Sequence, residues 1–202
     1  MKTRKLSILL AALFVIAGAV FATGARAEGE VPAPPAIGST IEDFTLPDVD
    51  NKDRSLKSLA GKNGTVLLFV SVQCPVSNAY NERMAKLADD YQAKGIAVVG
   101  INSNVAEDCA AVKTHAAEHK LSFPILKDAG NKVADKLGAS VTPEAYFIDV
   151  NNKLLYHGRI DNSRNAAQVE TSDLRNALDA ALAGKTIEKS EAKAFGCTIK
   201  RA

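Results

Sequence analysis

The chain has 202 residues, of which 47% are hydrophobic, 24% are charged and only 5% are aromatic. A chain of this length can bury a core in one compact domain. Its formal net charge of +2 argues against a nucleic-acid-binding surface, which requires a dense basic patch.

The first 27 residues have the three parts of a secretory signal peptide. "MKTRK" is basic, residues 6–22 are uncharged and mostly apolar, and "ARA" at 25–27 offers small residues for cleavage, which we place after Ala27. The alternative is an uncleaved anchor, because a run of this length is close to the shortest membrane span. Cleavage lowers Lys+Arg from 25 to 21 against 23 Asp+Glu, so the net charge becomes about −2. We therefore expect a periplasmic or secreted protein with no stable membrane span.

Export would place the chain where disulfides persist, yet it has only three cysteines, Cys74, Cys109 and Cys197. Three cysteines are too few for a disulfide scaffold, and the odd number leaves at least one thiol unpaired within the molecule. This pattern favours redox chemistry over structural cross-linking.

The segments that follow the leader alternate between strand and helix patterns. Residues 28–36 are a proline-rich linker, and residues 44–64 indicate a short hairpin followed by a helical turn. The remaining elements are a strand at 65–72, a helix at 78–94, a strand at 96–102, a helix at 106–120, a short strand at 123–128, a helix at 131–138, strands at 144–150 and 153–160, and a helix at 171–184.

These patterns predict an α/β domain with a central mixed sheet. The segments 65–72 and 96–102 are β-branched and apolar, which is typical of strands buried on both faces. The helices at 78–94 and 171–184 each end at a glycine. We expect the first strands to be parallel, and the last two strands to form an antiparallel hairpin around the turn "NNK" at 151–153.

Cys74 lies in the segment "SVQCPVSNAY" (71–80), between the first core strand and the helix that follows it. Open α/β sheets carry functional groups at this end, and Pro75 suits the first turn of a helix. A thiolate there would face the positive end of the helix and its unpaired N–H groups, which lower a thiol pKa. Ser77 can hydrogen-bond to the sulfur but cannot form a disulfide with it. The alternative is a buried cysteine that only packs.

A second segment, "GASVTPEAYFID" (138–149), places Thr142 and Pro143 directly before a predicted strand. X-Pro bonds adopt the cis form at modest cost, and a cis proline in a tight loop is a deliberate feature. The arrangement is similar to the cis-proline loop that faces the active cysteine across a thioredoxin fold.

Several further motifs stand in an order that is typical of one family. They are Cys74-Pro75-Val76-Ser77 with Tyr80 and Arg83, "GIAVVGINSN" (95–104), "FPILKD" (123–128), "VTPEAYFID" (141–149), "LYHGRIDN" (155–162) and "KAFGCTIK" (193–200). Together they resemble the thioredoxin-like redoxins, and more narrowly the peroxiredoxin-like branch of the alkyl hydroperoxide reductase/thiol-specific antioxidant (AhpC/TSA) group.

The resemblance extends over about residues 37–200 and implies a thioredoxin fold. That fold has a central mixed β-sheet flanked by helices, here with an N-terminal hairpin extension. We expect the redoxin domain at 37–185 and a C-terminal tail at 186–202. The resemblance also implies that Cys74 is the reactive, peroxidatic-type cysteine and that Pro143 is the cis proline.

The sequence departs from the family in residues that bind peroxide. Peroxiredoxins show Pro-x-x-x-Thr/Ser-x-x-Cys, but Leu67 stands at the proline position here, although Ser71 keeps the hydroxyl. Tyr156 lies near the usual place of an arginine, and Arg159 is an odd number of residues further along the strand, so it points to the other face. Arg83 is a candidate substitute if its helix turns it inward; the alternative is a solvated or ion-paired side chain.

Cys197, in the tail, is a candidate resolving cysteine that would form a disulfide with Cys74. The alternatives are a tail thiol with a separate role and a bridge between Cys197 and Cys109. Cys109 lies among alanines in a predicted helix, and we interpret it as a packed residue. His115 and His119 share a helix face but lack a third metal ligand at a matching spacing.

These features predict an exported, antioxidant-type thiol oxidoreductase whose Cys74 thiolate attacks a disulfide sulfur or a peroxide oxygen. Ser71, Pro75, Thr142 and Arg83 are expected to support that site. The expected partners are a reducing thiol protein and a substrate that is a thiol/disulfide protein or a peroxide, and neither an organic cofactor nor a metal is required. The alternative is a non-catalytic binding module that holds Cu(I) or a partner thiol at its cysteines.

Overall fold

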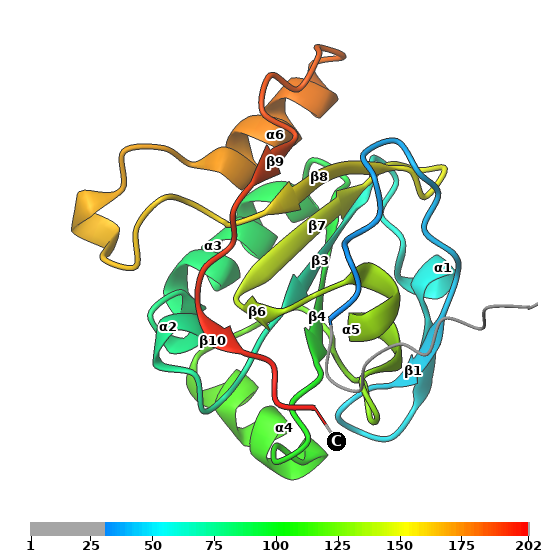
Figure 1. Ribbon diagram of the computed structural model, residues 1–202, viewed down its shortest axis with the longest axis vertical. Helices are drawn as coiled ribbons and strands as arrows, with labels where there is room; N and C mark the ends of the chain where they lie inside the picture. Colours follow the sequence, from blue (N-terminus) through cyan, green and yellow to red (C-terminus); the bar gives the residue numbers. More distant parts are fainter. Residues whose placement is uncertain (1–30, 202) are drawn as a thin grey trace, which may run out of the picture. The chain divides into compact units, whose positions relative to one another are not determined.

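A six-stranded mixed β-sheet lies at the centre of the computed structural model, which describes residues 31–201 (Figure 1). The predicted signal peptide lies outside the described residues. In spatial order the strands are β5 (Ile125–Lys127), β4 (Ala97–Asn102), β3 (Thr65–Phe69), β7 (Glu144–Ile148), β8 (Leu154–Gly158) and β9 (Glu191–Ala192).

Strands β3, β4 and β5 form the parallel half of the sheet. Two helices, α2 (Pro75–Asn78) and α3 (Asn81–Gln92), connect β3 to β4, and α4 (Cys109–Glu118) connects β4 to β5. Right after β3, therefore, the chain turns into α2 at the carboxyl edge of the parallel strands, where the sequence predicts the functional cysteine.

The helix predicted at 78–94 is α3, and a separate helical turn, α2, precedes it. The Tyr80 N–H donates to the Ser77 carbonyl, three residues earlier, which makes a tight turn between the two helices. The helix that directly follows Cys74 is consequently a single turn rather than a long helix.

The antiparallel half of the sheet follows α5 (Lys132–Leu137) and the short strand β6 (Val141–Thr142). β7 pairs antiparallel with β3 and with β8, and the β7–β8 turn contains Asn152 at a φ of 60°. This is the hairpin predicted around 151–153. α6 (Asp173–Leu182) follows β8 and packs on β7 and β8.

The N-terminal extension is an antiparallel hairpin, as predicted. Its strands are β1 (Thr45–Pro47) and β2 (Asp53–Ser55), and the helical turn α1 (Leu56–Leu59) follows. Ser55 caps α1 by accepting a hydrogen bond from the Ser58 N–H. The sheet order, the parallel and antiparallel halves and the flanking helices together form a thioredoxin fold with a hairpin extension.

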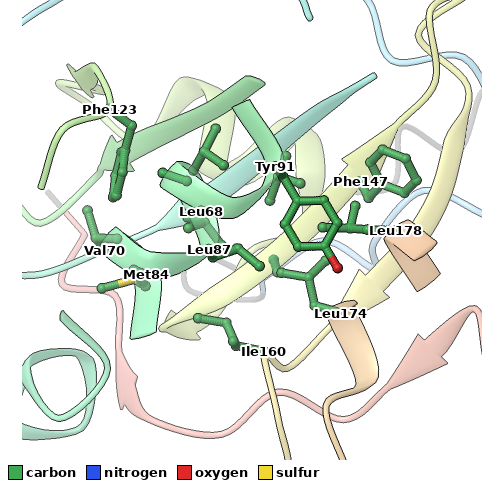
Figure 2. Packing of buried hydrophobic residues seen from close by; sticks show 14 of the residues in the cluster. Leu68, Val70, Met84, Leu87, Tyr91, Phe123, Phe147, Ile160, Leu174 and Leu178 are labelled. Atoms are coloured by element: carbon green, nitrogen blue, oxygen red, sulfur yellow. The ribbon is translucent and has the colours of Figure 1, made fainter. Parts of the chain in front are cut away.

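An apolar cluster covers each face of the sheet. Successive residues of β3 point to opposite faces, so Leu68 belongs to one cluster and Leu67 to the other. Figure 2 shows one of them, in which Leu68 of β3 packs near Met84, Leu87 and Tyr91 of α3. All five residues of β3 are buried. A fully buried side chain of this kind contributes roughly 1.5–3 kcal/mol, so β3 is a rigid base for the loop that it leads into.

The C-terminal tail returns along the molecule in extended form (red in Figure 1). It adds β9 to the sheet beside β8, and then β10 (Cys197–Thr198) pairs antiparallel with β6. The sequence did not predict these short strands. No helix within residues 31–201 has the length and apolarity that a membrane crossing requires.

Candidate active site

Cys74 lies at the N-cap position of α2, and Pro75 is the first residue of that helix, as the sequence predicts. Only 3% of the Cys74 residue is exposed. Its sulfur accepts a hydrogen bond from the Ser77 N–H at 3.2 Å, and its thiol donates to the Thr142 carbonyl at 3.2 Å. The sulfur is therefore held between α2 and the loop that precedes β7.

The pKa of the Cys74 thiol lies below its ordinary value. Burial raises this pKa, but the side chains of Cys197 and Thr142 and the N–H groups of Ser77 and Cys197, which stabilise the thiolate, outweigh that effect. Because α2 is a single turn, these individual donors, rather than the dipole of a long helix, lower the pKa. A larger fraction of Cys74 is consequently a thiolate at neutral pH than of an ordinary cysteine.

The Thr142–Pro143 peptide bond is cis, as the sequence predicts. Both residues are buried, and the loop places Thr142 beside the Cys74 sulfur. The buried Thr142 hydroxyl has no hydrogen-bond partner among the described residues, and it is close enough to the Cys74 sulfur to lower the Cys74 pKa by stabilising the thiolate.

Cys197 reaches the same place from the tail. Cys74 and Cys197 are free thiols that line the same cavity, and Cys197 is the register partner of Thr142, whose carbonyl accepts from Cys74. Burial raises the pKa of Cys197, and the neighbouring Cys74 raises it further, while the Val76 N–H lowers it. The structure thus brings together the two cysteines for which the sequence suggests a disulfide, with the lower pKa on Cys74.

A cavity of about 260 Å³ opens beside the two cysteines. The described residues that line it do not include Cys109, which is the first residue of α4. The lining residues are Ser71, Gln73, Cys74, Asn104, Ala106, Glu107, Cys197, Thr198 and Lys200.

A buried carboxylate, Glu107, holds the loop before Cys74. It accepts hydrogen bonds from the Ser71 hydroxyl at 2.6 Å and from the N–H groups of Val72 and Gln73 at 3.0 and 3.1 Å. The Ser71 hydroxyl in turn accepts from the Cys74 N–H at 3.1 Å. Burial raises the pKa of Glu107, but these hydrogen bonds lower it overall, so the carboxylate is ionised.

A second buried carboxylate, Glu144, holds the cis-proline loop. It accepts from the N–H groups of Ser140 and Val141 at 2.8 and 3.1 Å, and it lies 2.6 Å from His157 Nε2. The sequence pattern singles out neither glutamate. Each glutamate lies at the edge of a predicted element, where an acidic residue is normally solvated. The sequence around each glutamate also does not indicate which loop its carboxylate binds.

The structure corrects the expected contact of Ser77. The sequence allows its side chain to hydrogen-bond to the Cys74 sulfur, but the Ser77 hydroxyl accepts from the Ser71 N–H at 3.2 Å. The backbone N–H of Ser77 contacts the sulfur instead. Ser77 therefore acts through its position in α2 rather than through its hydroxyl.

Arg83 does not support Cys74, because its side chain forms an ion pair and a ring contact away from the cysteine. Its guanidinium pairs with Asp161 at 2.6 Å and lies over the Tyr80 ring, 3.6 Å from the ring centroid. Arg159 pairs with Asp173 at 2.7 Å. The ion-paired alternative is therefore correct for Arg83, and the described lining of the cavity contains neither arginine.

His115 of α4 lies beside α2, His119 caps the C-terminus of α4, and neither is among the residues that line the cavity. The rings of His115 and His119 are 4.4 Å apart, and His115 Nε2 is 2.9 Å from Asn78 Oδ1. Within residues 31–201, no group of three or more His, Cys, Asp and Glu side chains is placed to hold a metal ion.

The chain is similar to known redox proteins. It is 32% identical over 154 residues to the thiol-disulfide oxidoreductase ResA of Geobacillus thermodenitrificans, covering 76% of this chain and 83% of that protein. It is 28% identical over 137 residues to the chloroplastic peroxiredoxin Q of Sedum lineare, covering 63% and 72%. The crystal structure of a hypothetical protein from Sinorhizobium meliloti superposes with a TM-score of 0.78 at 35% identity, covering 84% and 97%. The sequence pattern of the AhpC/TSA family matches residues 37–157, more than half of the chain, and the chain therefore belongs to the AhpC/TSA family.

Proposed function

We propose that this protein is an exported thiol–disulfide oxidoreductase in which Cys74 is the nucleophile and Cys197 is its resolving partner. The observation that carries the proposal is that Cys74 and Cys197 line one cavity beside the cis Thr142–Pro143 bond, with Cys197 opposite Thr142 and Cys74 bonded to the Thr142 carbonyl. The ResA relative is named as an oxidoreductase of this class, which supports it. Export, to the periplasm or the medium, rests on the signal-peptide pattern of the first 27 residues.

The pKa difference between the two thiols assigns their order of action. The Cys74 thiolate attacks one sulfur of a substrate disulfide, and the other sulfur leaves as a thiolate. Cys197 then loses its proton and attacks Cys74 Sγ in the mixed disulfide. This step releases the second substrate thiolate and forms the Cys74–Cys197 disulfide. A dithiol partner supplies the two electrons that restore both thiols.

The site favours disulfide exchange over peroxide reduction. A peroxidase requires hydrogen-bond donors that stabilise the charge developing as the O–O bond breaks. The Ser71 hydroxyl already donates to Glu107, and both Arg83 and Arg159 are held in ion pairs. Peroxide reduction is the second candidate, which the similarity to peroxiredoxin Q favours.

Reaction rates of single-thiol variants test the proposal. Cys109→Ala serves as the reference protein, because Cys109 is outside the site. At neutral pH the reference should react with a small model disulfide faster than a free thiol does, and by a larger factor than with hydrogen peroxide. Adding Cys74→Ser should abolish both reactions. Adding Cys197→Ser should keep the first attack and accumulate the mixed disulfide on Cys74.

Two results would contradict the proposal. If Cys74→Ser reacts as fast as the reference, Cys74 is not the nucleophile. If the reference reacts with neither reagent faster than a free thiol but binds Cu(I) tightly through its two thiols, the protein is a binding module rather than an enzyme.

A further inference from the structure

The last residues of the tail, 196–201, lie across the active site, and we call them the strap (Figure 1). β10, within the strap, pairs with β6 and places Cys197 opposite Thr142. The contact is close: a Cβ atom at residue 196 would lie 1.9 Å from the Thr142 carbonyl oxygen, so only Gly196 fits there. The strap therefore rests directly on the cis-proline loop.

Two side chains fasten the strap beyond Cys197. Ile199 is buried, with 3% exposure, in the apolar cluster that includes residues of α5. Arg201 donates to Asp135 at 2.9 Å and to the Ala139 carbonyl at 2.6 Å. On the other side of Cys197, β9 fastens the tail to β8. The strap is consequently held at both ends.

The closed strap limits what can reach Cys74. It occupies the free edge of β6, and it covers a sulfur whose residue is only 3% exposed. The approach that remains is the cavity of about 260 Å³ between Cys74 and Lys200. Pockets for drug-sized ligands are typically 300–1,000 Å³, so the size of this cavity suits a small disulfide better than a polypeptide segment.

We infer that the strap determines specificity: while it is closed, Cys74 reacts only with small disulfides, and a polypeptide disulfide reaches Cys74 only after the strap lifts from β6. This inference rests on the proposed function of Cys74. Ile199 and Arg201 set the population of the lifted state, because opening must break their contacts.

Labelling Cys74 with reagents of two sizes tests the inference. In a protein carrying Cys109→Ala and Cys197→Ser, Cys74 is the only thiol. Its rates with N-ethylmaleimide and with a polymer-bound maleimide are each divided by the rate for the unfolded protein. We expect the polymer-bound reagent to be slower than the small one by roughly tenfold or more. Arg201→Ala should remove most of that difference and leave the rate of the small reagent unchanged.

Matched variants separate the possible results. Lys193→Ala changes an exposed tail residue and should leave the ratio of rates as it is. Ile199→Ala is a second way to loosen the strap, with folding checked by circular dichroism. If the two reagents label Cys74 equally fast, or if neither Arg201→Ala nor Ile199→Ala changes the ratio, the strap inference is wrong while the proposed function stands. If N-ethylmaleimide labels Cys74 no faster than a free thiol, the proposed function is wrong.

Discussion

Replacing Glu107 by Gln would test how the loop before Cys74 is held. Each oxygen of this buried carboxylate accepts two hydrogen bonds, and three of the four donors belong to residues 71–73. A glutamine has the same shape, but its amide nitrogen cannot accept a hydrogen bond. Whichever way the amide is turned, two donors lose their acceptor and face N–H groups instead.

The size of the effect follows from these contacts. A hydrogen bond to a charged group contributes roughly 1.5–3 kcal/mol, so the loss of two removes roughly 3–6 kcal/mol. Glutamine also removes a buried charge, which offsets part of this loss. We therefore expect Glu107→Gln to lower the free energy of unfolding by about 2–4 kcal/mol. Because a displacement of about 1 Å can cost a hundredfold in rate, we expect Cys74 to react roughly tenfold or more slowly.

Urea denaturation gives the free energy of unfolding, and amide hydrogen exchange reports on the loop. Exchange at Val72 and Cys74 should become faster in Glu107→Gln, together with the slower reaction of Cys74. Asp128→Asn is the matched control, because Asp128 is also buried but binds the start of α5 instead. It should lower stability without affecting exchange at residues 72–74. If Glu107→Gln loses stability while loop exchange and Cys74 reactivity stay normal, our interpretation of Glu107 is wrong.

Three further predictions follow from the site and the leader. Thr142→Val should raise the pKa of Cys74, because it removes a donor to the thiolate, and so shift the pH profile of Cys74 alkylation upward; an unchanged profile would contradict this role. Burial raises the pKa values of Glu107 and Glu144, but hydrogen bonds hold both below the ordinary 4.5. The two carboxylates therefore stabilise the folded protein above pH 4.5, and this contribution is lost as the pH falls through their lowered pKa values. Acid denaturation of Glu107→Gln should accordingly be shallower than that of the parent protein, and an equally steep curve would refute this. The mature protein should begin at Glu28, as N-terminal sequencing can show, whereas a chain that keeps its leader would be an anchor.

The fold could be predicted because its core elements have strong local patterns. β3 and β4 consist mainly of apolar and β-branched residues, and Asn152 stands in a hairpin turn that favours a positive φ. The short strands β6, β9 and β10 escaped prediction, since two residues are too few to show a period. β9 also depends on close approach to Gly158, where a Cβ would lie 1.8 Å from the Ala192 carbonyl oxygen.

The position of Cys74 was predictable because it depends on neighbours in the chain. A strand, then a cysteine, then a proline places the thiol at the start of a helix. The contacts of Arg83 were not predictable in the same way, because its partner, Asp161, is far away in the sequence. The same holds for Glu107, whose role depends on how the loop after β4 folds back on the loop after β3.

Disulfide mapping of the oxidised protein tests the pairing of Cys74 with Cys197 most directly. After treatment with a small disulfide, digestion without reduction and mass spectrometry should recover a peptide in which residues 74 and 197 are linked, with Cys109 free. A bridge between Cys109 and Cys197, or an oxidised protein in which Cys74 remains a thiol, would contradict the proposed mechanism.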